Sequence, residues 1–259
     1  MNVSEGRRPE LVAALGAAAG DALLDVHVDA DHHRSVLTLV GEQAPRALAE
    51  AAVAALDLRE HTGVHPRFGV VDVVPFVPIR DASMAEAVAA RDAFARWAAT
   101  TLDLPCFLYG PPPDPSLPEV RREAFRARPP DVGPPTPHET AGACAVGARR
   151  PLLAYNVWLA VDDLPLARAI AAELRGPHVR ALGLQVQGAV QVSMNLLEPT
   201  VVGPAEVVDA VAQRAPVART ELVGLAPSAV LDGCPASRWA ELDLAPERTV
   251  EARLAARGW

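Results

Sequence analysis

The sequence predicts an α/β (α+β) protein of two subdomains. Short apolar runs rich in β-branched residues alternate with alanine-rich stretches of helical periodicity, which is the pattern of α/β and α+β folds. The chain has 259 residues, 50% of them hydrophobic and 22% charged, so its composition is that of a globular protein with a sizeable core. After two proline-rich stretches, a second and similar series of predicted strands and helices begins. We therefore expect a boundary near Arg149–Pro151, between subdomains 1–150 and 151–259.

Apolar residues at helical spacing predict seven helices, and the third of them opens with a capping box in which Glu86 follows Ser83 by three residues. The predicted helices are Leu11–Leu24, Pro45–Leu58, Ser83–Thr101, Leu117–Arg128, Leu164–Leu174, Ala205–Arg214 and Pro246–Arg257. The run Val70–Val77 is almost entirely apolar, which indicates a central strand. The predicted strands are Leu23–Val28, Ser35–Val40, Val70–Val77, Pro105–Tyr109, Pro151–Leu159, Leu184–Leu197 (one long strand or two short ones) and Thr220–Leu225.

The composition excludes several classes of function. All 24 basic side chains are arginine, so no lysine can form a Schiff base or serve a Walker-type nucleotide site. A net charge of −8 argues against a nucleic-acid partner, and no apolar run of 18 residues predicts a membrane span. Cys106, Cys144 and Cys234 lack metal-type spacing and are expected to be packed, reduced thiols. We expect a cytoplasmic protein that acts on small molecules.

The segment His61–Phe76, HTGVHPRFGVVDVVPF, carries the densest chemistry. His65 is suited to general acid/base work, because an imidazole titrates near neutral pH. Gly63 permits a tight turn before it, Pro66 stiffens the peptide after it, and Arg67 can hold a carboxylate. The pair His61 and His65, four residues apart, would suit zinc on a helix, but the glycine and proline make a helix unfavourable.

This segment resembles the motif H-x-G-x-H-P-R-x-G-x-x-D-V-x-P-F of the glutamate formiminotransferase family. The resemblance continues through NVSEG after Met1, YNVWL at Tyr155–Leu159, QVSMNLL at Gln191–Leu197 and ELVGLAP at Glu221–Pro227. It implies two α/β subdomains with facing β-sheets in a double layer and helices outside. It also implies transfer of the formimino group from N-formimino-L-glutamate to the co-substrate tetrahydrofolate, with His65 catalytic, no metal, and a homodimer.

Two further segments correspond to family sites. The turn Val26–Ser35 has His27 where animal members carry an aspartate, so the partner that orients His65 stays open among the acids Asp25, Asp29, Asp31 and Asp72. Gly133–Gly142, followed by ACAVGAR, matches a folate-binding loop, although a proline- and glycine-rich linker is the alternative. The residues expected to bind substrate or folate are Arg34, Arg67, Asp72, Gly133, Pro134, Gly142 and Arg149, with possible support from Asp25, His27 and His61.

Two other functions remain open from the sequence. A folate-binding relative could transfer another one-carbon group or act on another formimino compound, and the changes at His27 and inside the loop favour this. A non-catalytic folate-binding or assembly protein is the second alternative, and the intact triplet His65-Pro66-Arg67 argues against it. We expect Arg34, Arg67 and Arg149 to form a local cluster that attracts anionic substrates despite the net negative charge.

Overall fold

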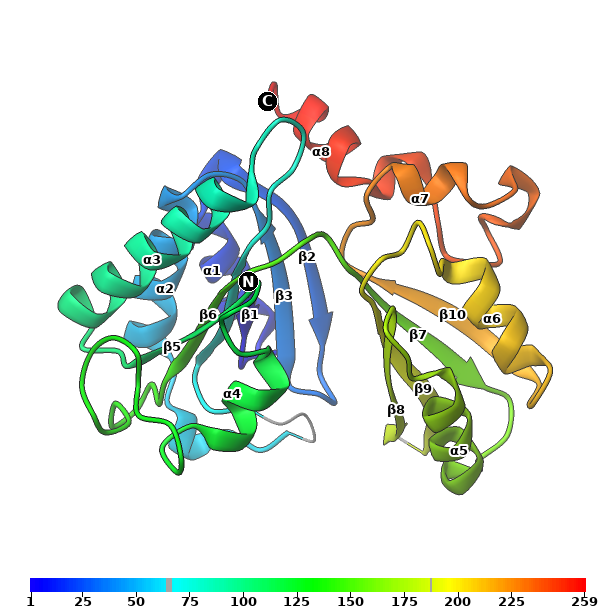
Figure 1. Ribbon diagram of the computed structural model, residues 1–259, viewed down its shortest axis with the longest axis horizontal. Coiled ribbons are helices and arrows are strands. Elements are labelled where there is room, and N and C mark those ends of the chain that lie inside the picture. The colour runs from blue at the N-terminus through cyan, green and yellow to red at the C-terminus, as the bar shows by residue number, and fades with distance from the viewer. Residues whose placement is uncertain (64–66, 187) are drawn as a thin grey trace. The chain divides into compact units, whose positions relative to one another are not determined.

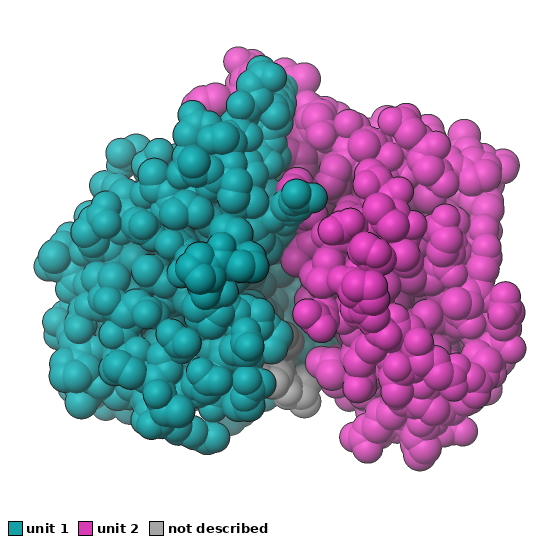
Figure 2. All heavy atoms as spheres, viewed as in Figure 1, with its two compact units in different colours: residues 1–150 teal, residues 151–259 magenta. Residues whose placement is uncertain are grey.

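The computed structural model describes residues 1–63, 67–186 and 188–259. The chain forms two compact units, residues 1–150 and residues 151–259, shown in different colours in Figure 2. Each unit has its own β-sheet and its own hydrophobic core. The predicted α/β class with two sheets and two subdomains is confirmed.

Unit 1 is built on a six-stranded mixed sheet of order β2-β3-β1-β4-β6-β5 (Figure 1). Its strands are β1 (Asn2–Val3), β2 (Leu23–Asp29), β3 (Arg34–Leu39), β4 (Val71–Phe76), β5 (Cys106–Tyr109) and β6 (Cys144–Ala148). Its helices are α1 (Pro9–Ala18), α2 (Gln43–Ala55), α3 (Met84–Thr101) and α4 (Leu117–Glu123). Helices α1 to α3 pack on one face, where Leu37, Leu48 and Phe94 are almost completely buried.

The apolar run predicted as a central strand lies in the middle of this sheet. Strand β4 pairs antiparallel with β1 and parallel with β6, and its first four residues are buried. Burial on both faces explains why the segment reads as a continuous apolar run. Because β4 lies in the middle of the sheet, the residues just before Val71 also have a fixed position next to it.

Unit 2 has a four-stranded antiparallel sheet of order β10-β7-β9-β8. Its strands are β7 (Leu153–Leu159), β8 (Val179–Val186), β9 (Ala189–Leu196) and β10 (Val217–Val223), and its helices are α5 (Leu164–Leu174), α6 (Pro204–Ala212), α7 (Ala229–Asp232) and α8 (Val250–Ala256). Helices α5 and α6 lie along one face of the sheet (Figure 1). The core between them includes the fully buried Tyr155 and Leu222.

Several predicted boundaries need correction. The first helix ends at Ala18, because Leu23 and Leu24 belong to β2. Helix α4 ends at Glu123, five residues early, and Phe125 then adopts a φ of 56°, which no right-handed helix can contain. The run predicted at Leu184–Leu197 is the hairpin β8–β9, and β8 begins already at Val179.

Strands β1 and β6 and helix α7 were not predicted. β1 has two residues and α7 four, too few for a periodicity to show. The last helix is also divided, because Pro246–Arg248 forms a separate 3-10 turn and Thr249 caps α8 by accepting a hydrogen bond from Ala252 N.

Candidate active site

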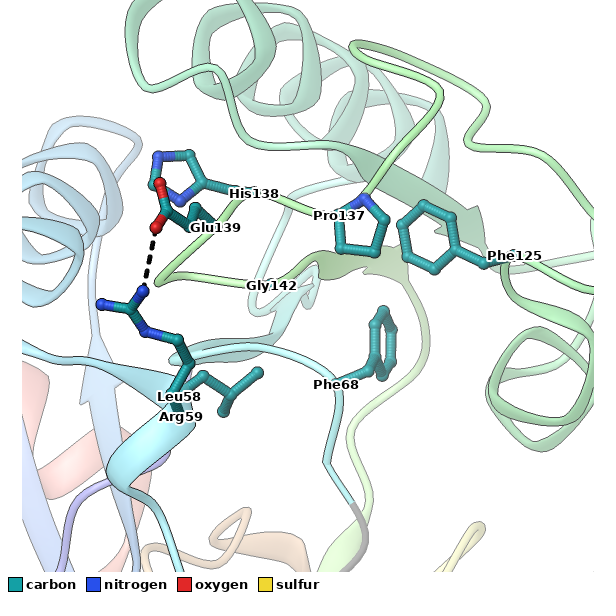
Figure 3. A pocket seen from close by; sticks show the side chains of 8 residues that line it. All are labelled: Leu58, Arg59, Phe68, Phe125, Pro137, His138, Glu139 and Gly142. Carbon is teal, nitrogen blue, oxygen red and sulfur yellow. Dashed lines mark hydrogen bonds and ion pairs between the residues drawn. The ribbon is translucent and has the colours of Figure 1, made fainter.

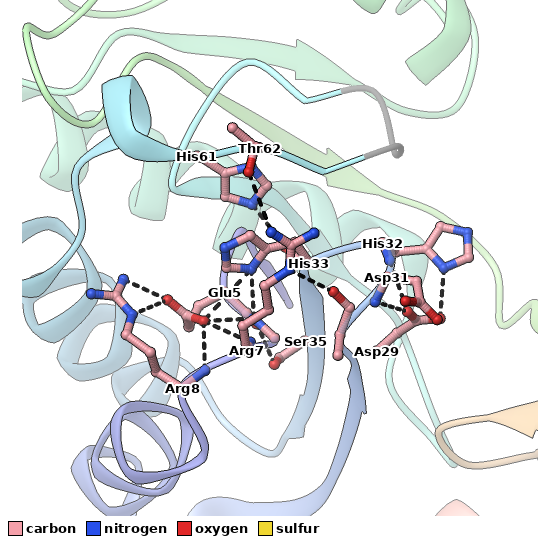
Figure 4. Close-up of polar contacts among 12 residues, drawn as sticks. Glu5, Arg7, Arg8, Asp29, Asp31, His32, His33, Ser35, His61 and Thr62 are labelled. Atoms are coloured by element: carbon pink, nitrogen blue, oxygen red, sulfur yellow. Dashed lines mark hydrogen bonds and ion pairs between the residues drawn. The ribbon is translucent and has the colours of Figure 1, made fainter. Parts of the chain in front are cut away.

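Three segments of unit 1 meet at the edge where β1 ends and β4 begins. They are residues 4–8, the turn between β2 and β3, and the approach to β4 from His61. Gly6 permits this meeting, because a Cβ there would lie 2.3 Å from the carbonyl oxygen of Asp29 and 2.6 Å from the nitrogen of Arg34. Arg7 then ties the other two segments together by donating to the Ala30 carbonyl (2.9 Å) and to the Thr62 hydroxyl (3.2 Å) (Figure 4).

Glu5 is a completely buried carboxylate at this meeting point. Its Oε1 accepts the main-chain N–H groups of Gly6, Arg7 and Arg8 at 2.8–3.0 Å, and its Oε2 accepts from the Arg8 Nε at 2.7 Å. Burial alone would raise the pKa of Glu5, but the main-chain hydrogen bond of Arg7 and those of Arg8 lower it below its usual value. Glu5 is therefore an ionised carboxylate at neutral pH.

Two imidazoles stack beside this carboxylate (Figure 4). The rings of His33 and His61 lie 4.1 Å apart between centroids at an angle of 22°. His33 Nδ1 accepts the Gly6 N–H (3.1 Å), so this nitrogen carries no proton, and its 3.6 Å approach to Glu5 is not an ion pair. His61 Nε2 donates to the His33 carbonyl (2.8 Å), and its buried Nδ1 has no hydrogen-bond partner.

Burial lowers the pKa of both imidazoles. For His33 the neighbouring His61 adds to the effect of burial, and for His61 the carbonyl hydrogen bond only partly offsets it. Both rings are therefore neutral at pH 7. A neutral imidazole with an unpartnered buried nitrogen can accept a proton or a hydrogen bond at this place.

Arg67 bonds the main chain just before the predicted catalytic histidine. Its NH1 donates to the Gly63 carbonyl and its NH2 to the His61 carbonyl, both at 3.0 Å. His65 itself lies outside the described residues.

Asp72 forms a buried hub with two arginines. Its Oδ2 accepts from Arg34 NH1 (2.6 Å) and Arg121 NH2 (2.5 Å), and its Oδ1 accepts the Phe68 N–H (3.0 Å). Burial opposes ionisation, but Arg34 and Arg121 outweigh it and keep the pKa of Asp72 below its ordinary value. The hub therefore fixes Arg34 and Arg121 as charged groups. Arg121 was not among the predicted residues. It lies on the arginine-rich helix α4, and the polar sequence of this helix gave no indication of a buried ion pair.

The glycine-rich loop packs against the approach to β4. Gly69 and Gly142 form an isolated bridge, and a Cβ on Gly69 would lie 1.8 Å from the Ala143 carbonyl oxygen. Gly142 has a φ of 72°, and a Cβ there would lie 2.3 Å from the Phe68 carbonyl oxygen. His138 shapes the loop, because its Nδ1 accepts the N–H groups of Thr140 (3.3 Å) and Ala141 (3.0 Å).

A pocket of about 320 Å³ opens between this loop and the motif (Figure 3). Its apolar part is formed by Phe68, Phe125 and Pro137, and the ion pair of Arg59 with Glu139 (2.9 Å) stands at another side. Phe68 belongs to both sites, because its N–H donates to Asp72 and its ring lies under the Arg121 guanidinium at 5.4 Å. The arginine hub and the pocket are therefore adjacent.

The remaining predicted residues occupy different places. Asp25, His27 and Asp29 are every second residue of β2, and each keeps part of its surface exposed. Asp29 is committed to its own turn, since it accepts the N–H groups of Asp31 and His32 and bonds His32 Nδ1 at 2.6 Å. Gly133, with a φ of 96°, and the following proline begin the loop.

Arg34, Arg121 and Arg67 form a positive cluster at Asp72. Burial lowers the pKa of Arg34 most, and the charges of Arg121 and Arg67 lower it further, as expected for neighbouring cations. Arg149 lies beside Tyr109 and donates to the Arg150 carbonyl at 3.0 Å. None of the three predicted arginines points only to solvent. In the described part of the chain, no group of three or more histidine, cysteine or acidic side chains is arranged to hold a metal.

Comparison with known proteins identifies the family. Residues 1–149 match the family model described as the formiminotransferase domain, N-terminal subdomain. The chain is 37% identical over 225 residues to a glutamate formimidoyltransferase of Streptococcus pyogenes, with 76% of this chain and 75% of that protein covered. The chain belongs to the formiminotransferase domain family.

Other members extend the similarity. A glutamate formimidoyltransferase of Thermoplasma acidophilum is 33% identical over 75% of this chain and 74% of its own. A formimidoyltransferase-cyclodeaminase of Rattus norvegicus is 34% identical over 89% of this chain, and the match spans 50% of the rat protein. Members of this formiminotransferase family are transferases of a one-carbon group. No helix within the described residues is long and apolar enough to cross a membrane.

One acidic residue of the site was not predicted from the sequence. Glu5 stands in the segment NVSEG, which had been matched to the family, and its burial directly beside two histidines could not be seen from spacing. The available signal was the position of Glu5 in the short segment between β1 and α1. Main-chain N–H groups there can supply the hydrogen bonds that a buried carboxylate needs.

Proposed function

We propose that this chain is a glutamate formimidoyltransferase that moves the formimino group from N-formimino-L-glutamate to tetrahydrofolate. The observation that carries the proposal is the 37% identity to the Streptococcus pyogenes protein of that name across three quarters of both chains. The arginine cluster around Asp72 supports it, because both substrates carry carboxylates that guanidinium groups bind well. In this proposal residues 151–259 are the second subdomain of the same transferase.

The proposed reaction needs one nucleophilic attack and one proton transfer. The N5 amine of tetrahydrofolate attacks the amidine carbon, a C–N bond forms, and the bond from that carbon to the glutamate nitrogen breaks. His65 takes the proton from N5 and returns it to the departing nitrogen. Arg67 donates to the carbonyls of His61 and Gly63, which precede His65 in the chain. Orientation of the two reactants supplies roughly 7–11 kcal/mol of the barrier reduction in well-aligned systems.

The geometry of unit 1 supports an assignment of groups to ligands. Arg34 and Arg121 offer fixed positive charge beside the loop, and the aromatic wall of the adjacent pocket is suited to a flat ring or a benzoyl group. The two oxygens of Asp72 already accept hydrogen bonds from three donors. We therefore assign Asp72 to positioning the arginines rather than to contact with a substrate. Gly133, Pro134 and Gly142 shape the loop.

The test is an assay for 5-formiminotetrahydrofolate formation with purified protein. His65→Ala should lower turnover about 10²–10⁴-fold while folate affinity and melting temperature stay nearly constant, because only the proton relay is removed. His178→Ala, in unit 2, is the control and should leave turnover unchanged. Full activity of the His65 variant would contradict the assignment, and absence of any product with the unaltered protein would contradict the proposed function.

One other function is favoured by specific residues. His27 stands where animal members carry an aspartate, and Ala141, a completely buried residue of the loop, stands where they carry an aromatic residue. These changes suit a relative that uses another one-carbon donor. Binding of tetrahydrofolate without turnover of N-formimino-L-glutamate would favour this alternative.

We also propose that the reaction needs no metal, since proton transfer and carboxylate binding suffice for it. Activity that a chelator abolishes and zinc restores would overturn this and revive the pair His61 and His65 as ligands. A homodimer remains a prediction from the resemblance, and a cytoplasmic location remains a prediction from the composition. Light scattering of the purified protein measures the oligomeric state.

A further inference from the structure

Two of the three cysteines are direct neighbours in the sheet of unit 1. Cys106 is the first residue of β5 and Cys144 the first residue of β6, and the two are paired across these parallel strands (Figure 1). Side chains of directly paired residues point to the same face of a sheet. Both cysteines are free thiols without exposed surface. Cys234, the third cysteine, belongs to unit 2.

Unit 1 alone buries the two thiols. They belong to the same core cluster as Phe94 and Ala98 of α3, and every residue of this cluster lies in unit 1. Cys106 Sγ donates to the Leu104 carbonyl (3.4 Å). Burial raises the pKa of Cys106 to about 12, and burial together with the neighbouring Cys106 raises the pKa of Cys144 well above its ordinary value. Both thiols are therefore protonated at neutral pH, and each is close enough to affect the other.

The spacing of paired strands permits a bond between the two sulfurs but strains it. Neighbouring strands lie about 4.8 Å apart, which is within the Cα separations of roughly 4.4–6.8 Å found in disulfides. The side chains of directly paired residues run nearly parallel, so their Cβ atoms are also about 4.8 Å apart, whereas a disulfide brings them to about 3.8 Å. The bond must therefore draw the starts of β5 and β6 together. A strained disulfide is more easily reduced than a relaxed one.

The start of β6 is continuous with the glycine-rich loop of the candidate site. Cys144 directly follows Ala143, whose N–H donates to the Phe68 carbonyl (2.8 Å). The N–H of Phe68 in turn donates to Asp72. A bond between the two cysteines would close a loop of residues 107–143 that contains α4 and the whole glycine-rich loop. Strain at the start of β6 therefore acts on the contact between this loop and Phe68.

We propose that Cys106 and Cys144 are a redox-sensitive pair, which hydrogen peroxide converts reversibly to a disulfide whose strain loosens the contact of the glycine-rich loop with Phe68. Cys106 reacts first, because β5 is the edge strand of its sheet and opens locally more readily than β6, which is paired on both sides.

The reaction balances in two steps. The Cys106 thiolate attacks one oxygen of the peroxide, the O–O bond breaks, and a sulfenic acid forms while the released hydroxide takes up a proton to become water. The Cys144 sulfur then attacks the sulfenic sulfur, the S–S bond forms, and the S–O bond breaks as the hydroxyl leaves with the thiol proton as a second water. The two thiols lose two electrons and the peroxide gains them.

The experiment treats the full chain carrying Cys234→Ser with hydrogen peroxide, while circular dichroism verifies that it stays folded. Intact mass should fall by two hydrogen atoms, alkylation in denaturant should find no thiol, and a peptide pair should be joined through Cys106 and Cys144. Dithiothreitol should restore both thiols. Cys106→Ala and Cys144→Ala in the same background are the matched controls, and neither should lose two hydrogen atoms. Two remaining thiols, or sulfurs that gain oxygen without a cross-link, would overturn the inference.

Hydrogen exchange measured by mass spectrometry provides the second readout. Peptides that contain Ala143 should exchange faster in the oxidised protein than in the reduced one, because the strained start of β6 weakens the bond to Phe68. Peptides of unit 2 should exchange equally in both forms and serve as the internal control. Equal or slower exchange at Ala143 after oxidation would overturn the link to the glycine-rich loop. Neither readout depends on the proposed transferase activity.

Discussion

Asp72 is the residue on which most of the charge in the candidate site depends. Its carboxylate is completely buried and bonds two guanidinium groups and one main-chain N–H. Two cations and one anion leave a net positive charge at this point of an otherwise acidic protein. This excess positive charge can attract an anionic substrate. The charge stays at this position only while Asp72 holds the two arginines in place.

Asp72→Asn should therefore destabilise unit 1 strongly. Removing one partner of a buried ion pair leaves uncompensated buried charge, which costs about 3–5 kcal/mol of unfolding free energy. Urea unfolding followed by circular dichroism measures the change. Glu139→Gln is the matched control, because Glu139 pairs with Arg59 but is 83% exposed, and its loss should have little effect. Similar effects of the two substitutions would show that Asp72 is not the hub of the cluster.

The stacked pair of His33 and His61 predicts a pH dependence of stability. Their pKa values lie below the ordinary 6.5, so below that pH the unfolded chain binds more protons than the folded one. The contribution of the two imidazoles to stability should be complete above pH 6.5 and fall as the pH drops below it. The buried Met1 amine, whose pKa is lowered to about 5, acts in the same direction between pH 8 and 5. The lowered pKa values of Glu5 and Asp29 matter only at more acidic pH.

Urea unfolding at pH 7.5 and 5.5 tests this dependence. His33→Asn removes one of the two titrating rings and should reduce the loss of stability between these pH values, while the contribution of Met1 stays the same in both proteins. An unchanged difference between the two pH values in this variant would show that the stacked pair does not titrate as the geometry implies.

Among the elements, those with a clear period could be predicted and those set by long-range contacts could not. Helix α3 begins at its capping box as expected, with Ser83 accepting from Glu86 N and Glu86 accepting from Ser83 N. Strand β1 has only two residues, and its place between β3 and β4 depends on partners more than 30 residues away. Arg121 likewise lies on a short polar helix whose sequence contains no sign of a buried aspartate 49 residues earlier.

The close packing of two loops predicts a selective effect at Gly142. Gly142→Ala and Gly41→Ala place a side chain at nearly the same positive φ, 72° and 78°. Only the first substitution also clashes, with the Phe68 carbonyl, because nothing lies within 4 Å of a Cβ on Gly41. Gly142→Ala should cost a further ~1–3 kcal/mol of unfolding free energy and impair tetrahydrofolate binding. Equal costs would mean that the two loops are not in contact.

At the scale of the whole molecule, the two compact units have separate cores, and each core contains a leucine with no exposed surface. Leu37 lies in the core of unit 1 and Leu222 in that of unit 2. Replacing either by alanine leaves a cavity and should cost about 2–5 kcal/mol in its own unit. Because the two cores share no residue, we expect each unit to unfold with its own stability.

Tryptophan fluorescence can follow the two units separately. Trp97 is the tryptophan of unit 1, and the other three, Trp158, Trp239 and Trp259, belong to unit 2. In a protein with Trp97→Phe, the remaining fluorescence reports unit 2. Its unfolding transition should shift to lower urea with Leu222→Ala but not with Leu37→Ala. In far-ultraviolet circular dichroism, which follows both units, each of the two variants should shift one of the transitions. A single transition that moves equally with both substitutions would show that the units unfold together, because coupled units share every loss of stability.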